Sequence, residues 1–346
     1  MAKRFRILPR WRSLCVGVPL LLFVWAAGDS ALGEEALKPG DGIDTKTIPY
    51  KIVYESLREA NGTKNWELIM INADGSDPVN LTKTANVSEI YPHVSPDGTK
   101  VCFEGEEGTG NAKVRSVYCM NIDGTNRVKV AHNARQACWS PDSGTIAFLK
   151  AEFEKYTTQD FATKGVYLYD LKTGKTTEHP NCAKLYHLYN LCWSSDGKWF
   201  TATVHGGMGF KHAILAFPAD ANDVFDLGIG GCRPDFSADG KRLTWGLSDW
   251  DLCVANFELS AGKARVTGQR AIVKCDKEHE VYHTDFSPDG RYIAFSYGPE
   301  ADEMGAGEAP GWNICISDLT GKWVQVTTDG NHNKEPDWVP IPAAKP

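Results

Sequence analysis

The fold is decided by the stretch Val94-Ser95-Pro96-Asp97-Gly98, which is followed by a short apolar run at residues 101–103. The phrase joins an aromatic or apolar residue to Ser, then to a turn ending in Asp and Gly, and then to a strand. It recurs four more times, at intervals of 45, 54, 43 and 50 residues between its serines. The serines are Ser95, Ser140, Ser194, Ser237 and Ser287. A repeat of about 50 residues built from short strands and tight turns is typical of the blades of a β-propeller.

Two sets of strands accompany the phrase, an innermost strand before each turn and a second strand after it. Six innermost strands are predicted to end at Val94, Trp139, Trp193, Phe236, Phe286 and Trp338, and six second strands to lie near Ile52, Val101, Ile146, Phe200, Leu243 and Ile293. Because the series begins with a second strand and ends with an innermost one, its two ends are predicted to pair in one sheet. We therefore expect an all-β fold, a six-bladed β-propeller of four-stranded antiparallel blades, in which the C-terminal strand joins the N-terminal blade.

The predicted propeller spans residues 50–340, and a short tail follows at 341–346. Residues 1–33 indicate a secretory signal peptide, because five basic side chains precede an apolar run at 13–27 and small residues follow it. Residues 34–49 are predicted to be a linker. The alternative is an uncleaved membrane anchor, although an apolar run of about 15 residues is shorter than the roughly 20 that a spanning helix needs. The expected location is the periplasm or the outside of the cell.

The predicted mature chain is acidic. Removal of residues 1–33 takes away five of the 37 Lys and Arg side chains and one of the 44 Asp and Glu side chains. The 32 basic and 43 acidic side chains that remain give a formal charge near −11, and the basic ones are scattered. Nucleic-acid binders carry clustered positive charge, so nucleic acid is not an expected partner.

Nine cysteines follow residue 33, an odd number that leaves at least one thiol unpaired. Export would place them in a compartment where disulfides form. Cys102 and Cys119 are the pair expected to bond, because they fall on consecutive antiparallel strands. The alternative, in which most of the cysteines are small buried apolar side chains, stays open.

The repeated phrase, together with the Asn-x-Asp-Gly hairpins that begin at Asn72 and Asn121, resembles the TolB-like family of bacterial six-bladed β-propellers, which are related to WD-type repeats. The resemblance covers about residues 50–340 and implies an exported protein that contacts a protein partner through its propeller. TolB also carries an α/β domain ahead of the propeller, whereas fewer than twenty residues separate the predicted signal peptide from Lys51. The resemblance therefore implies the propeller and export without that domain.

Long loops are predicted on one face of the propeller. The Asp-Gly turns share the opposite face, so the segments 150–164, 204–212 and 297–311 crowd the other mouth of the channel. Loops on a rigid scaffold often carry binding residues. Insertion without function is the alternative for these segments.

One position in every innermost strand, two residues before the repeated Ser, is expected to face the channel. It is occupied by His93, Cys138, Cys192, Asp235, Asp285 and Asp337. Four of these are neighbours in the ring and form a predicted acidic arc: His93, Asp235, Asp285 and Asp337. The arc is a candidate site for a divalent cation such as Ca²⁺, which prefers oxygen ligands. The alternative is structural, with each buried carboxylate accepting backbone N–H groups from the adjoining blade.

A second set of candidates lies where the chain enters the innermost strands, at one predicted mouth of the channel. The expected ligand-binding residues are His132, Arg135, His187, Tyr189, Arg233, His283 and His332. No two of these four histidines are separated by a single residue, so no His-x-His spacing imposes a metal geometry on them. A resemblance to propeller polysaccharide lyases that use a histidine-held metal implies an alternative in which His187 and His283 are catalytic.

The sequence contains no Gly-x-Ser-x-Gly nucleophile elbow. The expected function is therefore that of an exported, monomeric, non-enzymatic scaffold that binds a protein, peptide or glycan over its loop-rich face. The alternative is a metal-dependent polysaccharide (oligo-uronide) lyase or hydrolase with its site at the channel mouth.

Overall fold

The computed structural model describes residues 42–60, 62–260, 263–300 and 311–341. The predicted signal peptide lies outside the described residues, as does the tail after Ile341. None of the described helices is long and apolar enough to cross a membrane. Helix in this part of the chain is limited to the 3-10 turns η1 (Thr45–Thr47), η2 (Gly110–Ala112) and η3 (Cys182–Lys184).

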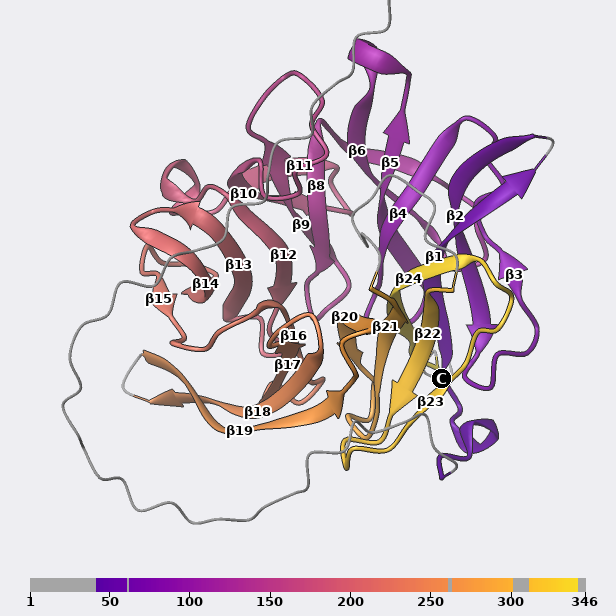
Figure 1. Cartoon of the computed structure of the whole chain (residues 1–346). Helices are drawn as coiled ribbons and strands as arrows, with labels where there is room; N and C mark the ends of the chain where they lie inside the picture. The colour runs from indigo at the N-terminus through magenta and orange to yellow at the C-terminus, as the bar shows by residue number, and fades with distance from the viewer. Residues whose placement is uncertain (1–41, 61, 261–262, 301–310, 342–346) are drawn as a thin grey trace, which may run out of the picture. The chain divides into compact units, whose positions relative to one another are not determined.

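The strands form six antiparallel sheets of four strands each, and the sheets follow one another around a ring as the blades of a propeller (Figure 1). From the innermost strand outward, blade 1 contains β24 (His332–Val339), β1 (Lys51–Ala60), β2 (Thr63–Asn72) and β3 (Val79–Asn80). Blade 2 contains β4 (Val87–Val94), β5 (Lys100–Glu107), β6 (Val114–Asn121) and β7 (Val128–His132). Blade 3 contains β8 (Ala134–Trp139), β9 (Thr145–Ala151), β10 (Thr163–Asp170) and β11 (Lys175–Glu178).

The other three blades repeat this order. Blade 4 contains β12 (Leu188–Trp193), β13 (Trp199–Gly207), β14 (Phe210–Pro218) and β15 (Phe225–Asp226). Blade 5 contains β16 (Cys232–Phe236), β17 (Arg242–Gly246), β18 (Asp251–Ser260) and β19 (Lys263–Lys274). Blade 6 contains β20 (His279–Phe286), β21 (Ile293–Pro299), β22 (Asn313–Ser317) and β23 (Trp323–Gln325). The predicted fold class and number of blades are confirmed.

The repeated Ser and Asp build the turn between the innermost and second strands of a blade. In the first copy Ser95 Oγ donates to Asp97 Oδ1 at 2.6 Å and accepts the backbone N–H of Lys100 at 2.9 Å. The same two bonds recur at Ser140, Ser194, Ser237 and Ser287. The repeated phrase therefore stabilises the turn between two strands. For this reason it predicts the fold and does not indicate a ligand.

The ring is closed by the two ends of the repeat region, as predicted. β1 lies antiparallel to β24, with Ile52 opposite Trp338. Each pair of neighbouring blades shares an apolar core; between blades 4 and 5, for example, Trp199 packs in one cluster with Phe236 and Trp245. Large side chains from both blades therefore fill the space between neighbouring blades and hold the blades together.

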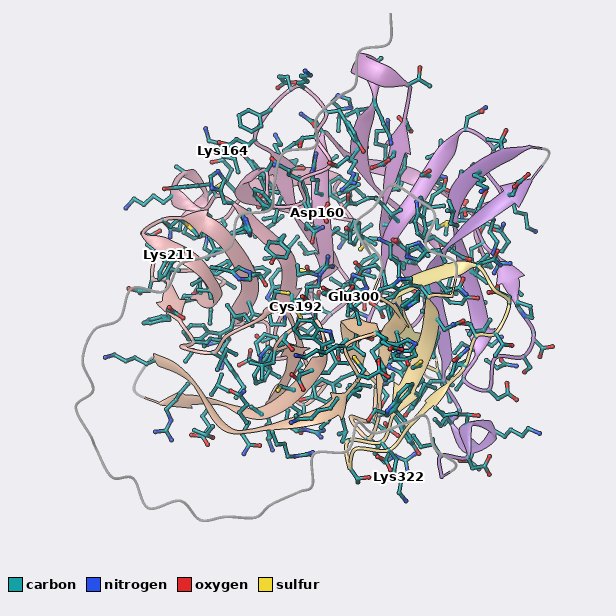
Figure 2. All side chains as sticks on the ribbon, viewed as in Figure 1. Asp160, Lys164, Cys192, Lys211, Glu300 and Lys322 are labelled. Carbon is teal, nitrogen blue, oxygen red and sulfur yellow. The ribbon has the colours of Figure 1, made fainter. Side chains whose placement is uncertain are left out.

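Side chains at the middle and the periphery of the ring differ in kind. Asp160 and Cys192 lie toward the middle and are buried, whereas Lys211 and Lys322 project from the periphery and are exposed (Figure 2). A buried carboxylate at the centre of the ring requires partners there, because an unpaired buried charge is costly. The channel is therefore where the polar contacts need to be traced.

The cysteines of the described residues form no disulfide with one another. Cys102 and Cys119 lie directly opposite one another on β5 and β6, as predicted, but the predicted disulfide between them is not formed in the structure. Both are buried, and burial raises the pKa of the Cys119 thiol to about 11. Cys102 and Cys119 pack with the apolar cluster between blades 2 and 3, in the manner of the small buried side chains that were the alternative.

Candidate functional site

The channel wall carries a bulge at the same place in all six innermost strands. The pairing register with the second strand shifts there, and the residue four positions before the repeated Ser, or before Val339 in blade 1, has φ between 49° and 59°. These residues, which we call the bulge ring, are Tyr91, Gln136, Asn190, Arg233, His283 and Glu335. None is glycine, so each holds a strained conformation that persists only where its surroundings fix it. Bulges of this kind redirect side chains, here toward the channel.

The preceding blade fixes the bulge through a hydrogen bond. The N–H of Tyr91 donates to Glu55 at 2.6 Å, and the N–H of Gln136 donates to Glu104 at 2.8 Å. Three more bulge N–H groups are accepted by side-chain oxygens of Gln136, Thr203 and Ser296. Glu55 and Glu104 are enclosed, and burial raises the pKa of each carboxyl to about 7.

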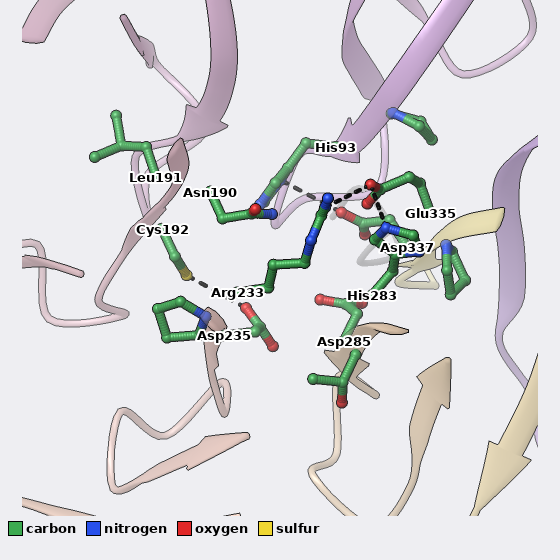
Figure 3. Close-up of a pocket in the computed structure, with 14 residues that line it drawn as sticks. His93, Asn190, Leu191, Cys192, Arg233, Asp235, His283, Asp285, Glu335 and Asp337 are labelled. Carbon is green, nitrogen blue, oxygen red and sulfur yellow. Dashed lines mark hydrogen bonds and ion pairs between the residues drawn. The ribbon is translucent and has the colours of Figure 1, made fainter. Parts of the chain in front are cut away.

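Three members of the bulge ring meet in the channel from different blades. Glu335 Oε1 lies 2.8 Å from Arg233 Nη1 and 2.8 Å from His283 Nε2 (Figure 3). Burial acts to raise the pKa of Glu335, but the positive charges of His283 and Arg233 outweigh it and hold that pKa below its usual value. The three side chains therefore form a buried charge cluster that links blades 5, 6 and 1.

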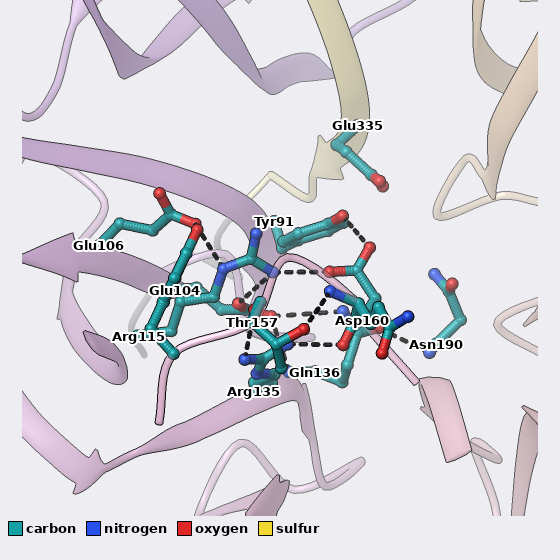
Figure 4. A network of polar contacts seen from close by, with 12 residues as sticks. Tyr91, Glu104, Glu106, Arg115, Arg135, Gln136, Thr157, Asp160, Asn190 and Glu335 are labelled. Atoms are coloured by element: carbon teal, nitrogen blue, oxygen red, sulfur yellow. Dashed lines mark hydrogen bonds and ion pairs between the residues drawn. The ribbon is translucent and has the colours of Figure 1, made fainter. Parts of the chain in front are cut away.

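A second polar network joins the loop between β9 and β10 to the channel. Asp160, from this loop, accepts a hydrogen bond from the Tyr91 hydroxyl at 2.5 Å and pairs with Arg115 at 2.6 Å (Figure 4). Burial opposes ionisation of Asp160, but Arg115 and the Tyr91 hydroxyl lower its pKa overall. Arg115 also pairs with Glu106 on the neighbouring strand.

The same loop is fastened by Arg135, one of the predicted ligand-binding residues. Its guanidinium donates to the backbone carbonyls of Thr157 and Gln159, both at 2.8 Å (Figure 4). Arg135 is only 1% exposed. Its side chain therefore positions the loop, whose long sequence marked it as a candidate binding segment.

The predicted acidic arc is assembled in the channel next to the bulge ring. A cavity of about 80 Å³ is lined by all four of its residues, His93, Asp235, Asp285 and Asp337, as well as by Arg233, His283 and Glu335. Figure 3 shows these side chains converging from separate blades. Cys138, which occupies the same register, is fully buried.

Carboxylates of the arc accept backbone N–H groups across the blade boundaries. Asp235 accepts the N–H of Phe286 at 2.9 Å, and Asp285 accepts the N–H of Trp338 at 3.1 Å. Burial raises the pKa of both carboxyls, and the negative charges of Asp337 and Asp235 add to that effect at Asp285. Across the described residues, no group of three or more His, Cys, Asp or Glu side chains is arranged to hold a metal ion. The calcium site remains a prediction.

The seven predicted ligand-binding residues have different surroundings. Arg233 and His283 meet at Glu335 in the channel, whereas His132 is exposed at the end of β7, an outermost strand. His332 is buried, with its ring centroid 5.0 Å from that of Trp66 and 6.0 Å from that of Trp312. The two residues of the lyase alternative have different partners: His187 lies 3.1 Å from Glu152, and His283 is bound to Glu335.

His187 and Tyr189 belong to a surface cluster of aromatic side chains that the sequence pattern does not reveal. We call it the aromatic patch, and its members are Phe161, Tyr186, His187, Tyr189, His205 and His212. Phe161 stacks on His205 with ring centroids 4.2 Å apart, and the Tyr189 hydroxyl lies 3.1 Å from His212 Nε2. His187 contacts the Tyr186 ring and also pairs with Glu152, which precedes Phe153. The patch therefore combines the β9–β10 loop with the β13–β14 hairpin and the start of β12.

The comparisons with known proteins agree with this architecture. TolB from Acinetobacter baumannii aligns with a TM-score of 0.60 and 17% identity over 84% of this chain and 67% of that one. A TolB structure from Agrobacterium tumefaciens aligns with a TM-score of 0.55 and 16% identity over 84% of this chain and 99% of that one. The fold is a TolB-like propeller. No protein-family profile matches the sequence.

One curated protein shows similarity in sequence. Dipeptidyl-peptidase 5 of Porphyromonas gingivalis is 24% identical in an alignment that covers 88% of this chain and 48% of that protein. The chain thus spans about half the length of the curated relative that it matches. The two TolB structures share the fold of this chain, but sequence identities this low do not by themselves imply a shared function.

Proposed function

We propose that this chain is a non-enzymatic binding propeller that takes a protein, peptide or glycan partner on the aromatic patch. The observation that carries the proposal is the exposure of that patch. Among the described residues the exposed large apolar side chains are Val79, Val128, Phe153, Tyr186 and Ile341. Of the two aromatic ones, Tyr186 at 37% belongs to the patch, and Phe153 at 54% directly follows Glu152, the ion-pair partner of His187. Exposed aromatic side chains supply much contact area for little loss of conformational entropy, and tyrosine is enriched at binding hot spots.

The anchoring of the patch supports the same proposal. The loop that carries Phe153 and Phe161 is tied to the channel by Arg135 and Asp160. A surface held in place before binding loses less entropy when the partner arrives. The predicted signal peptide favours action in the periplasm or outside the cell, where such a partner would be met.

The proposal is tested by removing the exposed rings without disturbing the core. In Phe153→Ala/Tyr186→Ala we expect partner capture by cross-linking in the native compartment to fall about tenfold or more. The matched control is Val79→Ala/Val128→Ala, which removes two exposed apolar side chains from other blades and leaves capture unchanged. Equal capture by both double variants contradicts the proposal. Turnover of oligo-uronides that disappears in His187→Ala would also contradict it and would support the lyase alternative.

A further inference from the structure

A second cavity of the channel, larger than the one at the bulge ring, lies at the other end, on the face that carries the Ser-Asp turns. Its volume is about 350 Å³, compared with about 80 Å³ for the cavity at the bulge ring. Ligand pockets commonly measure about 300–1,000 Å³, so the cavity has the size of a small-molecule or side-chain site. We call it the funnel. None of the seven predicted ligand-binding residues lines it.

The funnel is built from the repeat itself. Its rim consists of the residues that follow the repeated Ser, or Val339 in blade 1, and they are Pro96, Pro141, Ser195, Ala238, Pro288 and Pro340. Its wall consists of the residues that precede that position, and they are Val94, Trp139, Trp193, Phe236, Phe286 and Trp338. Every blade thus contributes one residue to the rim and one to the wall.

The wall presents apolar surface to the cavity although it contains three tryptophans. Each indole N–H is already bonded to a backbone carbonyl: Trp139 to His93, Trp193 to Gly197, and Trp338 to Asp285, at 2.7–3.2 Å. No indole donor is therefore left for a ligand. An apolar stem or an aromatic ring is the complement of such a wall.

The floor of the funnel is acidic. It is formed by His93, Cys192, Asp235, Asp285 and Asp337, and neither Lys nor Arg is found among the described residues that line the cavity. The Nδ1 atom of His93 is enclosed, has no hydrogen-bond partner in the described part of the chain, and lies 3.4 Å from Asp337 Oδ2. A cation on this floor would balance three carboxyl groups that crowd one another in an enclosed space.

We propose that the funnel binds an ammonium group carried on an apolar stem, with the ammonium on the Asp floor and the stem against the aromatic wall. The inference does not depend on the proposed function, which concerns the loop-rich face. An ammonium fits better than a bare metal ion for two reasons. Asp235 and Asp285 each have an oxygen atom that accepts a backbone N–H group, which leaves fewer oxygens for a metal ion. Ca²⁺ requires six to eight oxygen ligands. An aromatic wall also contributes to binding an organic cation and contributes nothing to a hydrated ion.

The test compares probes of equal length and different charge by isothermal titration calorimetry. Pentan-1-amine is the charged probe, pentan-1-ol its neutral match, and a capped Ala-Ala-Lys-Ala peptide presents the same ammonium as a side chain. We expect the amine to bind at least about tenfold more tightly than the alcohol. Binding of the peptide as well would identify a partner protein as the source of the ammonium, and binding of the amine alone would identify a free amine. Either result supports the proposal.

Two variants separate a direct effect on the floor from loss of folding. Asp285→Asn keeps an oxygen that can accept the Trp338 N–H, and we expect it to weaken amine binding about tenfold or more. Ala238→Trp fills the exposed rim without touching the floor, and we expect it to abolish binding of every probe. Asp123→Asn, a change at an exposed turn on another strand pair, serves as the control and leaves the affinity unchanged. Equal affinity for amine and alcohol, no binding of either charged probe, or a floor that binds Ca²⁺ alone would overturn the proposal.

Discussion

Glu335 is the residue on which the charge balance of the channel depends. It is buried, lies in the left-handed region with φ of 52°, and pairs with both Arg233 and His283. Removing one partner of a buried charge cluster strands the others, so Glu335→Ala is expected to lower the free energy of unfolding by roughly 3–5 kcal/mol in urea titration. Glu258→Ala breaks the exposed pair with Arg265 and is the control, with an expected loss below about 1 kcal/mol. Similar losses in the two variants would contradict a charge-balancing role for Glu335.

Glu104 makes a prediction about pH at the same scale. Burial raises its pKa from an ordinary 4.5 to about 7, so the folded protein holds this proton more tightly than the unfolded chain does. The resulting stabilisation is complete below pH 4.5 and is lost as the pH rises through 7. In Glu104→Gln, which retains an acceptor for the Gln136 N–H, we expect stability to fall less steeply between pH 5 and 7.5 than in the wild type. Denaturant titrations at several pH values measure the slope, and an unchanged slope would contradict the assignment.

The turns between strands depend on glycines whose surroundings differ. Gly98 has φ of 69°, and a Cβ built on it would lie 2.4 Å from the backbone oxygen of Pro340. Gly197 has φ of 73°, but its nearest neighbour would be a side-chain carbon of Pro141 at 3.7 Å. Gly197→Ala should therefore cost only the left-handed strain of roughly 1–2 kcal/mol, and Gly98→Ala should cost clearly more, because a backbone oxygen cannot move aside easily. Thermal unfolding of the two variants measures the loss of stability in each. Equal losses would show that the backbone at Pro340 moves aside without a large cost.

Strands and turns were predictable because the Ser-Asp phrase is a local signal. Ser95 and Asp97 bond within a few residues of each other, so the sequence alone locates the turn and the strand ends on either side, down to Val94 and Trp338. The bulge ring was missed, because Tyr91 and Asn190 differ in chemistry and share only a spacing of four residues before a Ser. That fixed spacing is the one sequence signal that could have located them. Their conformation depends on acceptors such as Glu55 in the preceding blade, which no local pattern reveals.

At the scale of the whole molecule, the order of the blades around the ring was predictable, and with it the residues that neighbour one another in the channel. Counting blades placed His93, Asp235, Asp285 and Asp337 around one cavity, and they do line one. Of the four predicted mouth histidines, His283 lines this cavity and His132, His187 and His332 do not, since loop conformation decides where such side chains lie. The aromatic patch was missed for the same reason, because its contacts join segments that are distant in the sequence: the β9–β10 loop, the start of β12 and the β13–β14 hairpin.

Closure of the ring leads to the last prediction. Trp338 on β24 lies opposite Ile52 on β1, is 2% exposed, and donates its indole N–H to Asp285 of blade 6. Trp338→Ala removes a large buried side chain at the seam and is expected to cost roughly 3–5 kcal/mol. Trp245→Ala, inside blade 5, should cost a similar amount and is the control for a cavity that does not open the seam. Hydrogen exchange distinguishes them: only Trp338→Ala should selectively deprotect the amides of β1, because the strand that covers them is the one that loosens. If the amides of β1 exchange no faster in Trp338→Ala than in Trp245→Ala, the backbone pairing of β24 with β1 is sufficient to hold the seam. The Trp338 side chain then has no special role in closing the ring.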